Sequence, residues 1–303
     1  MGGFFQELAK KLAERWVTLL VLPGALFIVL GWLGFTLGHD HALDWTAVSE
    51  RFSGTTASLS RLSGATQGVL VVVLLLAATG VGLAAQALAG MTRTIWLGTW
   101  PRPFAPLRRR LTSRRETRWM NLVTERKRLQ TAYPQPSRTA AQQDELNAVA
   151  ARLNHLALAR PGRPTWMGDR MHGVEVIARN RYGLDLTFGW PRLWLLLPEP
   201  TRTEITQAHT AFAAAVATGA WAWPYLLLAG FWWPSAAVAA GLGLVGWARG
   251  RSAVTDLAAL SEAALDLHGR TLAVALGVSL ADAAGPLTTT EGEQLTALFR
   301  KGR

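Results

Sequence analysis

The hydrophobic positions of this chain gather in four long apolar runs. The runs cover residues 16–37, 68–91, 211–230 and 234–248. A helix needs about 20 apolar residues to cross the hydrocarbon core of a bilayer. The first two runs exceed that length without a single Asp, Glu, Lys or Arg, which separates them from the shorter apolar stretch of a core helix. The pattern therefore predicts an all-α fold built on a four-helix transmembrane bundle.

The last two apolar runs form a pair, because only three residues separate them. The run 234–248 is the shortest of the four and is expected to cross the bilayer as the second arm of a helical hairpin. The first run follows Lys10, Lys11 and Arg15, as the apolar part of a secretion signal follows its basic start. However, that run is longer than the apolar part of such signals, and no clear cleavage site follows it. We therefore expect a retained anchor.

The apolar runs divide the chain into six segments. We expect an N-terminal tail with the first span (1–37), a short external loop (38–66), the second span (67–91), a basic cytoplasmic helical domain (92–210), a transmembrane hairpin of the third and fourth spans (211–250) and a cytoplasmic helical tail (251–303). The external loop is rich in Ser, Thr and Gly and is expected to be solvated.

Apolar positions at helical spacing predict the helices of the cytoplasmic segments. The expected helices cover 107–131, 139–159, 165–179, 252–283 and 290–300. Thr165 is a plausible N-cap, and Thr290 with Glu293 matches a capping box. A further helix is expected to begin near Thr201 and to continue into the third span. The segment 184–189 alternates in polarity without a partner strand, so we expect an extended loop or a buried corner there.

Positive charge is concentrated in one segment. The chain carries a net charge of +11, and the segment 92–210 holds 20 basic and 9 acidic residues. Loops on the cytoplasmic side of a membrane are enriched in Lys and Arg, and with four spans this segment and both termini lie on the same side. The 14 tryptophans are typical of membrane interfaces. We therefore expect a multi-pass protein of the cell (inner or plasma) membrane with both termini in the cytoplasm.

The expected helix 107–131 has the highest density of charge and an apolar side, so it is predicted to be a basic amphipathic helix. Its basic residues are Arg108, Arg109, Arg110, Arg114, Arg115, Arg118, Arg126, Lys127 and Arg128. Near a membrane, each such residue attracts anionic lipid by about 1 kcal/mol. Nucleic acid is a weaker candidate, because no nucleic-acid motif accompanies the charge. The alternative is a solvated face that only sets topology. Membrane lipids and a cytoplasmic or membrane protein are the expected partners.

Metal and thiol chemistry find little support in the sequence. The absence of cysteine removes disulfides, thiolate ligands and cysteine nucleophiles. His39, Asp40 and His41 are candidate metal ligands, but adjacent residues rarely complete a coordination shell and no further ligands cluster near them in the sequence. We therefore expect neither a metal site nor a cofactor.

The best catalytic-looking group is His172 with Asp169 and Glu175 on one expected helix. A structural or solvent-facing role is the favoured interpretation of this trio. A dinucleotide-type glycine pattern occurs in the run 234–248, but it lies inside a span with no preceding strand and is rejected. The chain is therefore expected not to be an enzyme.

Small residues recur four positions apart in the apolar runs, at Ala78–Gly82, Ala239–Gly243 and Gly246–Gly250. Such pairs let helices pack closely. Packing within one bundle is the favoured interpretation, and a face for a homo-oligomer is the alternative. The apolar runs contain no ionisable residue, which argues against an ion-coupled transporter.

Two short motifs lie before the third apolar run. They are Arg181-Tyr182-Gly183-Leu184-Asp185 and Trp190-Pro191-Arg192-Leu193. With Leu197-Pro198, this segment resembles a group of bacterial multi-pass membrane proteins that is common in high-GC actinobacteria. The resemblance covers the 160–210 region and implies a shared architecture without implying an activity. Physically, Arg192 and Asp185 are expected to form a buried pair near the membrane surface.

These features favour a non-enzymatic membrane protein: an anchor, scaffold or oligomeric component that presents a basic cytoplasmic domain to a partner or to anionic lipid. Two alternatives remain open. One is a small oligomeric channel or pore. The other is a membrane-embedded enzyme that acts on a lipid-linked substrate through the region of Arg192, Asp185 and His172.

Overall fold

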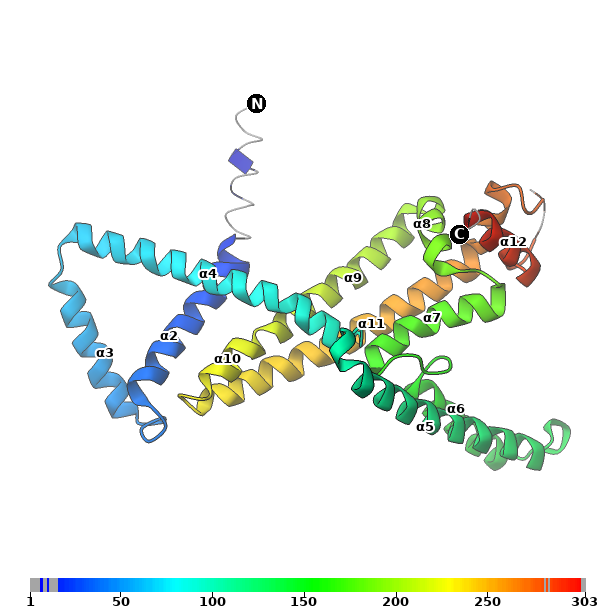
Figure 1. Ribbon diagram of the computed structural model, residues 1–303, viewed down its shortest axis with the longest axis horizontal. Coiled ribbons are helices and arrows are strands. Elements are labelled where there is room, and N and C mark those ends of the chain that lie inside the picture. The colour runs from blue at the N-terminus through cyan, green and yellow to red at the C-terminus, as the bar shows by residue number, and fades with distance from the viewer. Residues whose placement is uncertain (1–5, 8–9, 11–15, 281, 283, 301–303) are drawn as a thin grey trace. The chain divides into compact units, whose positions relative to one another are not determined.

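The computed structural model describes residues 6–7, 10, 16–280, 282 and 284–300. Within these residues the chain forms helices joined by turns and short loops, and it contains no strand (Figure 1). The predicted all-α fold is confirmed. The chain consists of two compact units: unit 1 comprises residues 1–92 and 214–248, and unit 2 comprises residues 93–213 and 249–303.

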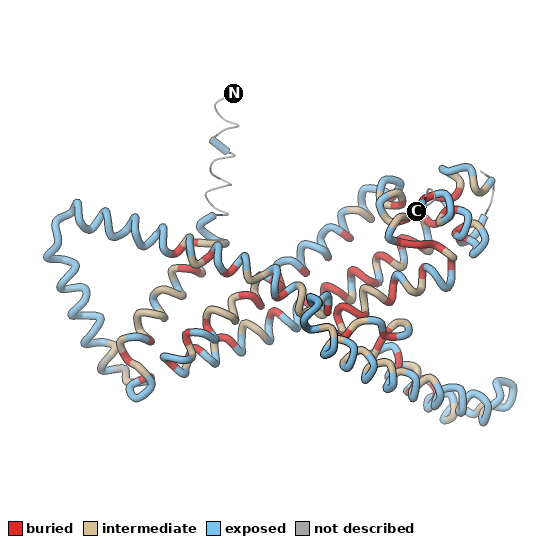
Figure 2. Tube along the Cα trace, viewed as in Figure 1, coloured by how far each residue is buried: buried red, intermediate tan, exposed pale blue. Residues whose placement is uncertain are grey.

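Unit 1 contains the most apolar helices. Its elements are a π-helical turn η1 (Val17–Val21), α2 (Leu22–Leu37), α3 (Trp45–Ser60), most of α4 (Gly64–Trp96), the end of α9 (Glu199–Ala220), α10 (Ala222–Leu228) and the first part of α11 (Pro234–Ala275). Many of their apolar side chains are exposed, as the pale segments of α4 show in Figure 2.

Two helical stretches are long and apolar enough to cross a membrane. They are α4 and the stretch Glu199–Leu228, which joins α9 and α10. Helix α2 is apolar but has only 16 residues, and the run 234–248 opens the 42-residue helix α11, whose apolar part is followed by Arg249 and Arg251. Among the described residues, the expected four-helix transmembrane bundle is therefore supported for two of its four helices.

Small residues bring the helices of unit 1 into close contact. A Cβ atom added to Gly24 of α2 would lie 2.0 Å from the carbonyl oxygen of Ala78 in α4, and one added to Gly82 would lie 2.8 Å from that of Leu20. A Cβ on Gly246 of α11 would likewise lie 2.6 Å from the backbone nitrogen of Gly219. These small residues therefore serve packing within one chain, as a larger side chain would separate the helices.

The expected solvated loop 38–66 is wrong in part, because its centre forms helix α3. Asp44 precedes the helix and accepts hydrogen bonds from the backbone N–H and the hydroxyl of Thr46, at 3.0 and 2.5 Å. A side-chain acceptor of this kind stabilises a helix start. Ser and Thr hydroxyls along the helix donate to carbonyls one turn earlier, so a composition typical of loops is accommodated in an exposed helix.

Unit 2 consists of a helical hairpin and a packed helical body. Its elements are α5 (Ala105–Ala132), α6 (Ala140–Leu156), α7 (Trp166–Tyr182), α8 (Leu186–Leu196), the start of α9, the second part of α11, α12 (Thr289–Arg300) and two short 3-10 turns, η2 (Arg102–Phe104) and η3 (Gln135–Ser137). The helices predicted over 107–131, 139–159 and 165–179 are confirmed, with small shifts at their ends.

The segment 184–189 is a buried corner that leads into a helix, so of the two expected alternatives the extended loop is wrong. Helix α7 ends at Gly183, whose φ of +64° is the left-handed conformation that glycine favours. Asp185 then caps α8 by accepting a hydrogen bond from the Thr187 N–H at 3.1 Å. The short apolar run after it therefore continues as helix, with Leu193 fully buried.

The core of unit 2 lies where α12 contacts α7 and α8. Leu184, Leu193, Leu265, Leu272 and Leu295 are almost completely buried, and each such side chain contributes about 1.5–3 kcal/mol to folding. The core therefore joins residues of α7 and α8 to residues of α11 and α12 that follow much later in the sequence.

The two expected tail helices need correction. The helix expected over 252–283 is the continuation of α11 and ends at Ala275. The capping box lies two residues earlier than predicted, because Thr288 and Glu291 bond reciprocally: the Glu291 N–H donates to the Thr288 hydroxyl at 3.3 Å, and the Thr288 N–H donates to the Glu291 carboxylate at 2.8 Å. The same sequence pattern fits both registers, so pattern alone could not choose between them.

Candidate functional site

Helices α5 and α6 pack against each other as a hairpin (Figure 1). The apolar residues that the sequence assigns to one side of α5 are half-buried, and those of α6 that pair with them are buried. They are Leu111, Trp119, Leu122 and Leu129 in α5, and Leu146, Val149 and Leu153 in α6. The start of α6 carries a complete capping box between Thr139 and Gln142. The hairpin thus holds α5 in place and leaves its remaining surface to solvent.

Seven of the nine predicted basic residues of α5 are exposed. They are Arg109, Arg110, Arg114, Arg118, Arg126, Lys127 and Arg128, while Arg108 and Arg115 are half-buried. Successive residues of a helix project about 100° apart, so the three arginines from Arg108 to Arg110 point in different directions. The predicted apolar side of α5 is thus the side that is half-buried, and the exposed basic residues spread over a broad part of the remaining surface instead of forming one narrow stripe.

Arg115 is a structural residue rather than a free binding residue. Its Nε donates to Asp169 Oδ2 at 2.9 Å, and its terminal nitrogen donates to the carbonyl of Leu156 at 2.9 Å. The other oxygen of Asp169 accepts from the backbone N–H groups of Gly162 and Arg163, both at 2.8 Å. This buried carboxylate therefore joins α5, α7 and the loop after α6.

Beside this joint, at the beginning of α5, lies a polar pocket of about 500 Å³. Its lining includes Arg108 and Arg109 of α5 and Arg163 of the loop, with the hydroxyls of Thr112 and Ser113 and the carboxylate of Glu116. Glu116 is already engaged in an ion pair with Arg160. Three further arginines therefore line a pocket whose lining carboxylate is already paired, and the guanidinium fork of arginine suits phosphate geometry. We call this set (Arg108, Arg109, Arg163) the hairpin-base arginines.

The expected pair between Arg192 and Asp185 does not form. Asp185 Oδ2 lies 3.0 Å from Arg300 and 3.6 Å from Arg179. Arg192 instead lies over the ring of Phe299, 4.4 Å from its centroid, and donates to the Phe188 carbonyl at 2.7 Å. Burial alone would raise the pKa of Asp185, but hydrogen bonds from Arg300 and Thr187 and the nearby charge of Arg179 lower it overall.

Arg181, Tyr182 and Gly183, which precede Asp185 in the first motif, contact neighbouring helices. The Tyr182 hydroxyl donates to Asp266 Oδ1 at 2.5 Å, and Arg181 lies 3.7 Å from the same carboxylate. Burial and this hydrogen bond raise the pKa of Tyr182 to about 12. A Cβ on Gly183 would lie 2.6 Å from the Thr289 carbonyl oxygen. These contacts connect the end of α7 to α11 and α12, which is a structural role.

The catalytic-looking trio on α7 does not assemble. His172 Nδ1 lies 3.1 Å from Glu175, and this hydrogen bond is the main cause that lowers the pKa of the Glu175 carboxyl. Asp169 points instead to Arg115 and the loop. Because His172, Asp185 and Arg192 each have different partners, they do not form the centre on which the enzyme hypothesis depends. In the described part of the chain, no group of three His, Asp or Glu side chains is placed to hold a metal ion.

An apolar cleft of about 640 Å³ in unit 2 was not predicted from the sequence. Trp190, Pro191 and Trp194 of α8 line it together with side chains of α7, α9 and α11. The signal was present in the two tryptophans spaced one turn apart, but it became meaningful only once the segment was known to be helical. Trp190 and Pro191 of the second motif, Trp190-Pro191-Arg192-Leu193, therefore line the cleft.

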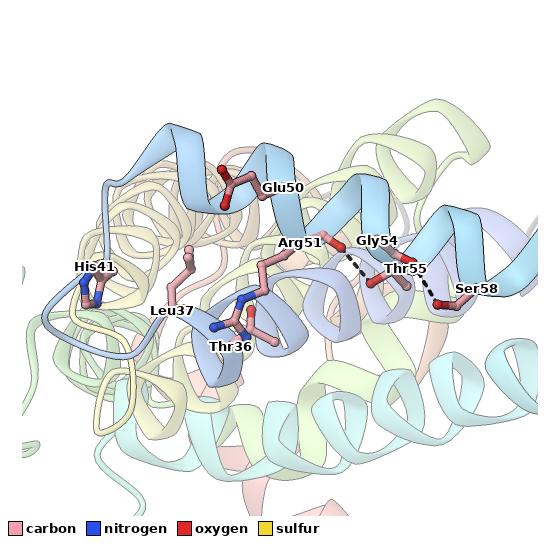
Figure 3. A pocket seen from close by; sticks show the side chains of 8 residues that line it. All are labelled: Thr36, Leu37, His41, Glu50, Arg51, Gly54, Thr55 and Ser58. Carbon is pink, nitrogen blue, oxygen red and sulfur yellow. Dashed lines mark hydrogen bonds between the residues drawn. The ribbon is translucent and has the colours of Figure 1, made fainter.

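A pocket of similar size lies in unit 1, between α2 and α3 (Figure 3). In Figure 3, the Arg51 side chain points toward Thr36, while Glu50 projects away from it. Thr55 and Ser58 also line this pocket, and their hydroxyls donate to carbonyls of their own helix. Glu50 and Arg51 give this pocket one charge of each sign, whereas three arginines line the pocket at the hairpin base.

Comparison with protein-family models, with curated proteins and with solved structures finds no match for this chain. The functional interpretation therefore depends on the geometry of the chain itself.

Proposed function

We propose that this protein is a non-enzymatic, multi-pass membrane anchor that holds its basic helical hairpin at the cytoplasmic surface of the cell membrane, where the hairpin base binds anionic lipid headgroups. The observation that carries the proposal is that the three hairpin-base arginines line one polar pocket. Cell membranes supply anionic headgroups at the cytoplasmic surface, where clustered Lys and Arg bind them.

The exposed apolar surface of α4 supports the membrane part of the proposal. Eight consecutive residues, Val69 to Leu76, are all Val or Leu, and each is between 39% and 65% exposed. Moving a partly exposed side chain of this kind from water into hydrocarbon gains on the order of 1 kcal/mol. Such a continuous apolar surface is rare on soluble monomers. An alkaline carbonate wash of isolated membranes tests this part: a peripheral protein is released, and the proposed anchor remains.

Four spans and cytoplasmic termini belong to the same proposal. The excess of basic residues in 92–210 favours this orientation. Fusing a reporter that is active only outside the cytoplasm after residues 55, 150 and 303 tests the topology. We expect a signal only at residue 55, and a signal at residue 150 would overturn the orientation.

The position of the basic pocket supports the lipid part of the proposal. Helix α4, which is apolar enough to cross a membrane, ends at Trp96, and Arg108 follows about a dozen residues later. Arg108 and Arg109 are therefore close in sequence to the end of the proposed second span.

The direct test compares two variants that remove the same charge from different places. The first replaces the hairpin-base arginines (R108Q/R109Q/R163Q), and the second replaces the exposed cluster at the far end of α5 (R126Q/K127Q/R128Q). The full chain is reconstituted in phosphatidylcholine nanodiscs, and binding of a fluorescent short-chain phosphatidylglycerol is measured by anisotropy. At about 1 kcal/mol per basic residue, the first variant is expected to bind on the order of a hundredfold more weakly.

The second variant is expected to bind nearly as well as the unchanged chain, because its charges lie outside the pocket. Equal losses in both variants would show that overall charge, and not the hairpin base, attracts the lipid. Unchanged binding in the first variant would overturn the proposal and favour an acidic protein partner for the hairpin.

A further inference from the structure

The apolar cleft of unit 2 has the character of a small-ligand site. Side chains from four helices surround it, among them Trp190 and Trp194 of α8, Val174 of α7, Ile205 of α9 and Leu257 of α11. Its volume of about 640 Å³ falls within the range of about 300–1,000 Å³ that is usual for such sites. The two tryptophan rings lie 6.4 Å apart at a tilt of 41°. These features favour an apolar ligand, or the apolar part of a larger one.

Part of the cleft wall belongs to a helical stretch whose later part is apolar enough to cross a membrane. Ile205, Thr206 and His209 lie in the first turns of the helical stretch Glu199–Leu228, which is long and apolar enough to cross a bilayer. On α8, Leu195 is 76% exposed beside Trp194. Trp194 thus lies in the helix just before this stretch, and tryptophan is enriched at membrane interfaces. The nearest source of an apolar ligand is therefore the lipid itself.

A cation lies next to the cleft. Arg202 and Glu199 line an adjoining hollow of about 560 Å³, and this hollow shares Trp194 and Thr206 with the cleft. Within the described chain, no carboxylate lies within ion-pair distance of Arg202, and its Nε is buried without a hydrogen-bond partner. A buried guanidinium nitrogen without an acceptor is costly, so an anionic group at this place would be stabilised.

Pro191 removes one backbone donor from the helix that lines the cleft. A proline inside a helix has no N–H to donate to the carbonyl four residues earlier, which here is that of Thr187. Both residues line the cleft. The wall is therefore mostly apolar, and the hydroxyl of Thr206 already donates to the Arg202 carbonyl at 2.7 Å.

We propose that this cleft binds one acyl chain of an anionic membrane lipid and that Arg202 holds the headgroup of the same lipid. The site is separate from the hairpin base, which involves other helices and other arginines. One lipid would thus be held against the faces of Trp190 and Trp194.

Photolabelling tests this proposal on the full chain. The protein is reconstituted in phosphatidylcholine vesicles that contain a small fraction of phosphatidylglycerol carrying a photoreactive diazirine on its acyl chain, and the labelled peptides are mapped. We expect the label in α8 and in the first turns of α9. An excess of unlabelled long-chain phosphatidylglycerol should remove it, whereas a dihexanoyl form, which lacks the long chain, should not.

Two matched tryptophan variants locate the ligand. Thr206 is exposed and lines the cleft, so Thr206→Trp fills it and is expected to reduce the cleft label at least fivefold. Ala211 is also exposed on α9 and lines neither hollow, so Ala211→Trp should leave the label unchanged. Circular dichroism and thermal unfolding verify that both variants fold, and the competition experiment on the unchanged chain does not depend on them.

Arg202→Gln tests the headgroup contact. At about 1 kcal/mol for one basic residue, labelling by the phosphatidylglycerol probe should fall about fivefold, while labelling by a phosphatidylcholine probe should change little. The hairpin-base variant should leave the cleft label intact, which separates this proposal from the proposed function. Label that is confined to segments such as Val69–Leu76, or that Thr206→Trp does not reduce, would overturn the proposal.

Discussion

At the scale of single residues, Asp185 combines two roles that can be separated. Its Oδ1 caps α8 through the Thr187 N–H, and its Oδ2 is shared by Arg300 and Arg179. The predicted partner, Arg192, is near in sequence, whereas Arg300 lies more than a hundred residues away. Sequence spacing reveals partners one helical turn apart, but it carries no information about which distant helix will pack on a given carboxylate.

Replacing Asp185 by Asn separates the two roles, because Asn also caps helices but carries no charge. We expect a loss of about 1–2 kcal/mol in the free energy of unfolding, because hydrogen bonds to charged groups contribute at that level. Asp144, which is exposed on α6, supplies the control: Asp144→Asn should change the unfolding free energy by less than about 0.5 kcal/mol. Chemical denaturation in detergent near neutral pH measures both.

The stability difference between the unchanged chain and Asp185→Asn is expected to depend on pH. The folded chain lowers the pKa of Asp185, so its stabilising contribution is present above the ordinary carboxyl pKa and is lost as the pH falls through the lowered value. The difference in the free energy of unfolding between the unchanged chain and Asp185→Asn should therefore disappear at acid pH. A gap that stays constant from neutral pH to acid would contradict the assignment of the charge to Arg300 and Arg179.

At the scale of elements, the sequence predicts helices best where apolar spacing and end signals agree. Helices α5, α6 and α7 follow this rule, and Thr139 and Thr165 are N-caps with the expected hydrogen bonds. Helix α3 has the composition of a loop. It can still be helical, because its Ser and Thr hydroxyls donate to carbonyls of the same helix. Helix α8 contains a proline and is short, so only the cap at Asp185 and the burial of Leu193 reveal it.

The connection between α5 and α7 gives a prediction at this scale. Arg115→Gln leaves the carboxylate of Asp169, whose side chain is only 2% exposed, without its cation. Removing one partner of a buried pair costs about 3 kcal/mol or more, so the midpoint of thermal unfolding should fall by several degrees. Arg118→Gln removes an equal charge from an exposed position on the same helix and should have almost no effect. Similar losses in both variants would show that Arg115 does not form the joint.

At the scale of the whole molecule, the proposed function depends on where apolar and basic side chains are exposed and not on a sequence motif. Apolar surface is exposed on α4, at the end of α10 and in the first part of α11, while exposed basic side chains occupy much of the surface of α5. The sequence predicts both features from apolar runs and charge counts. It could not predict the hairpin-base pocket, because Arg163 joins Arg108 and Arg109 only through the folding of the loop onto Asp169. Nor could it predict the apolar cleft, whose walls come from four separate helices.

The central claim is that the hairpin base holds anionic lipid, and the lipid retained by the purified protein tests it most directly. Native mass spectrometry of the full chain, extracted gently from its own membranes, would compare the unchanged protein with R108Q/R109Q/R163Q and with R126Q/K127Q/R128Q. We predict that the unchanged chain and the second variant retain anionic lipid in equal numbers, whereas the first retains fewer molecules. Equal retention by all three would contradict the account.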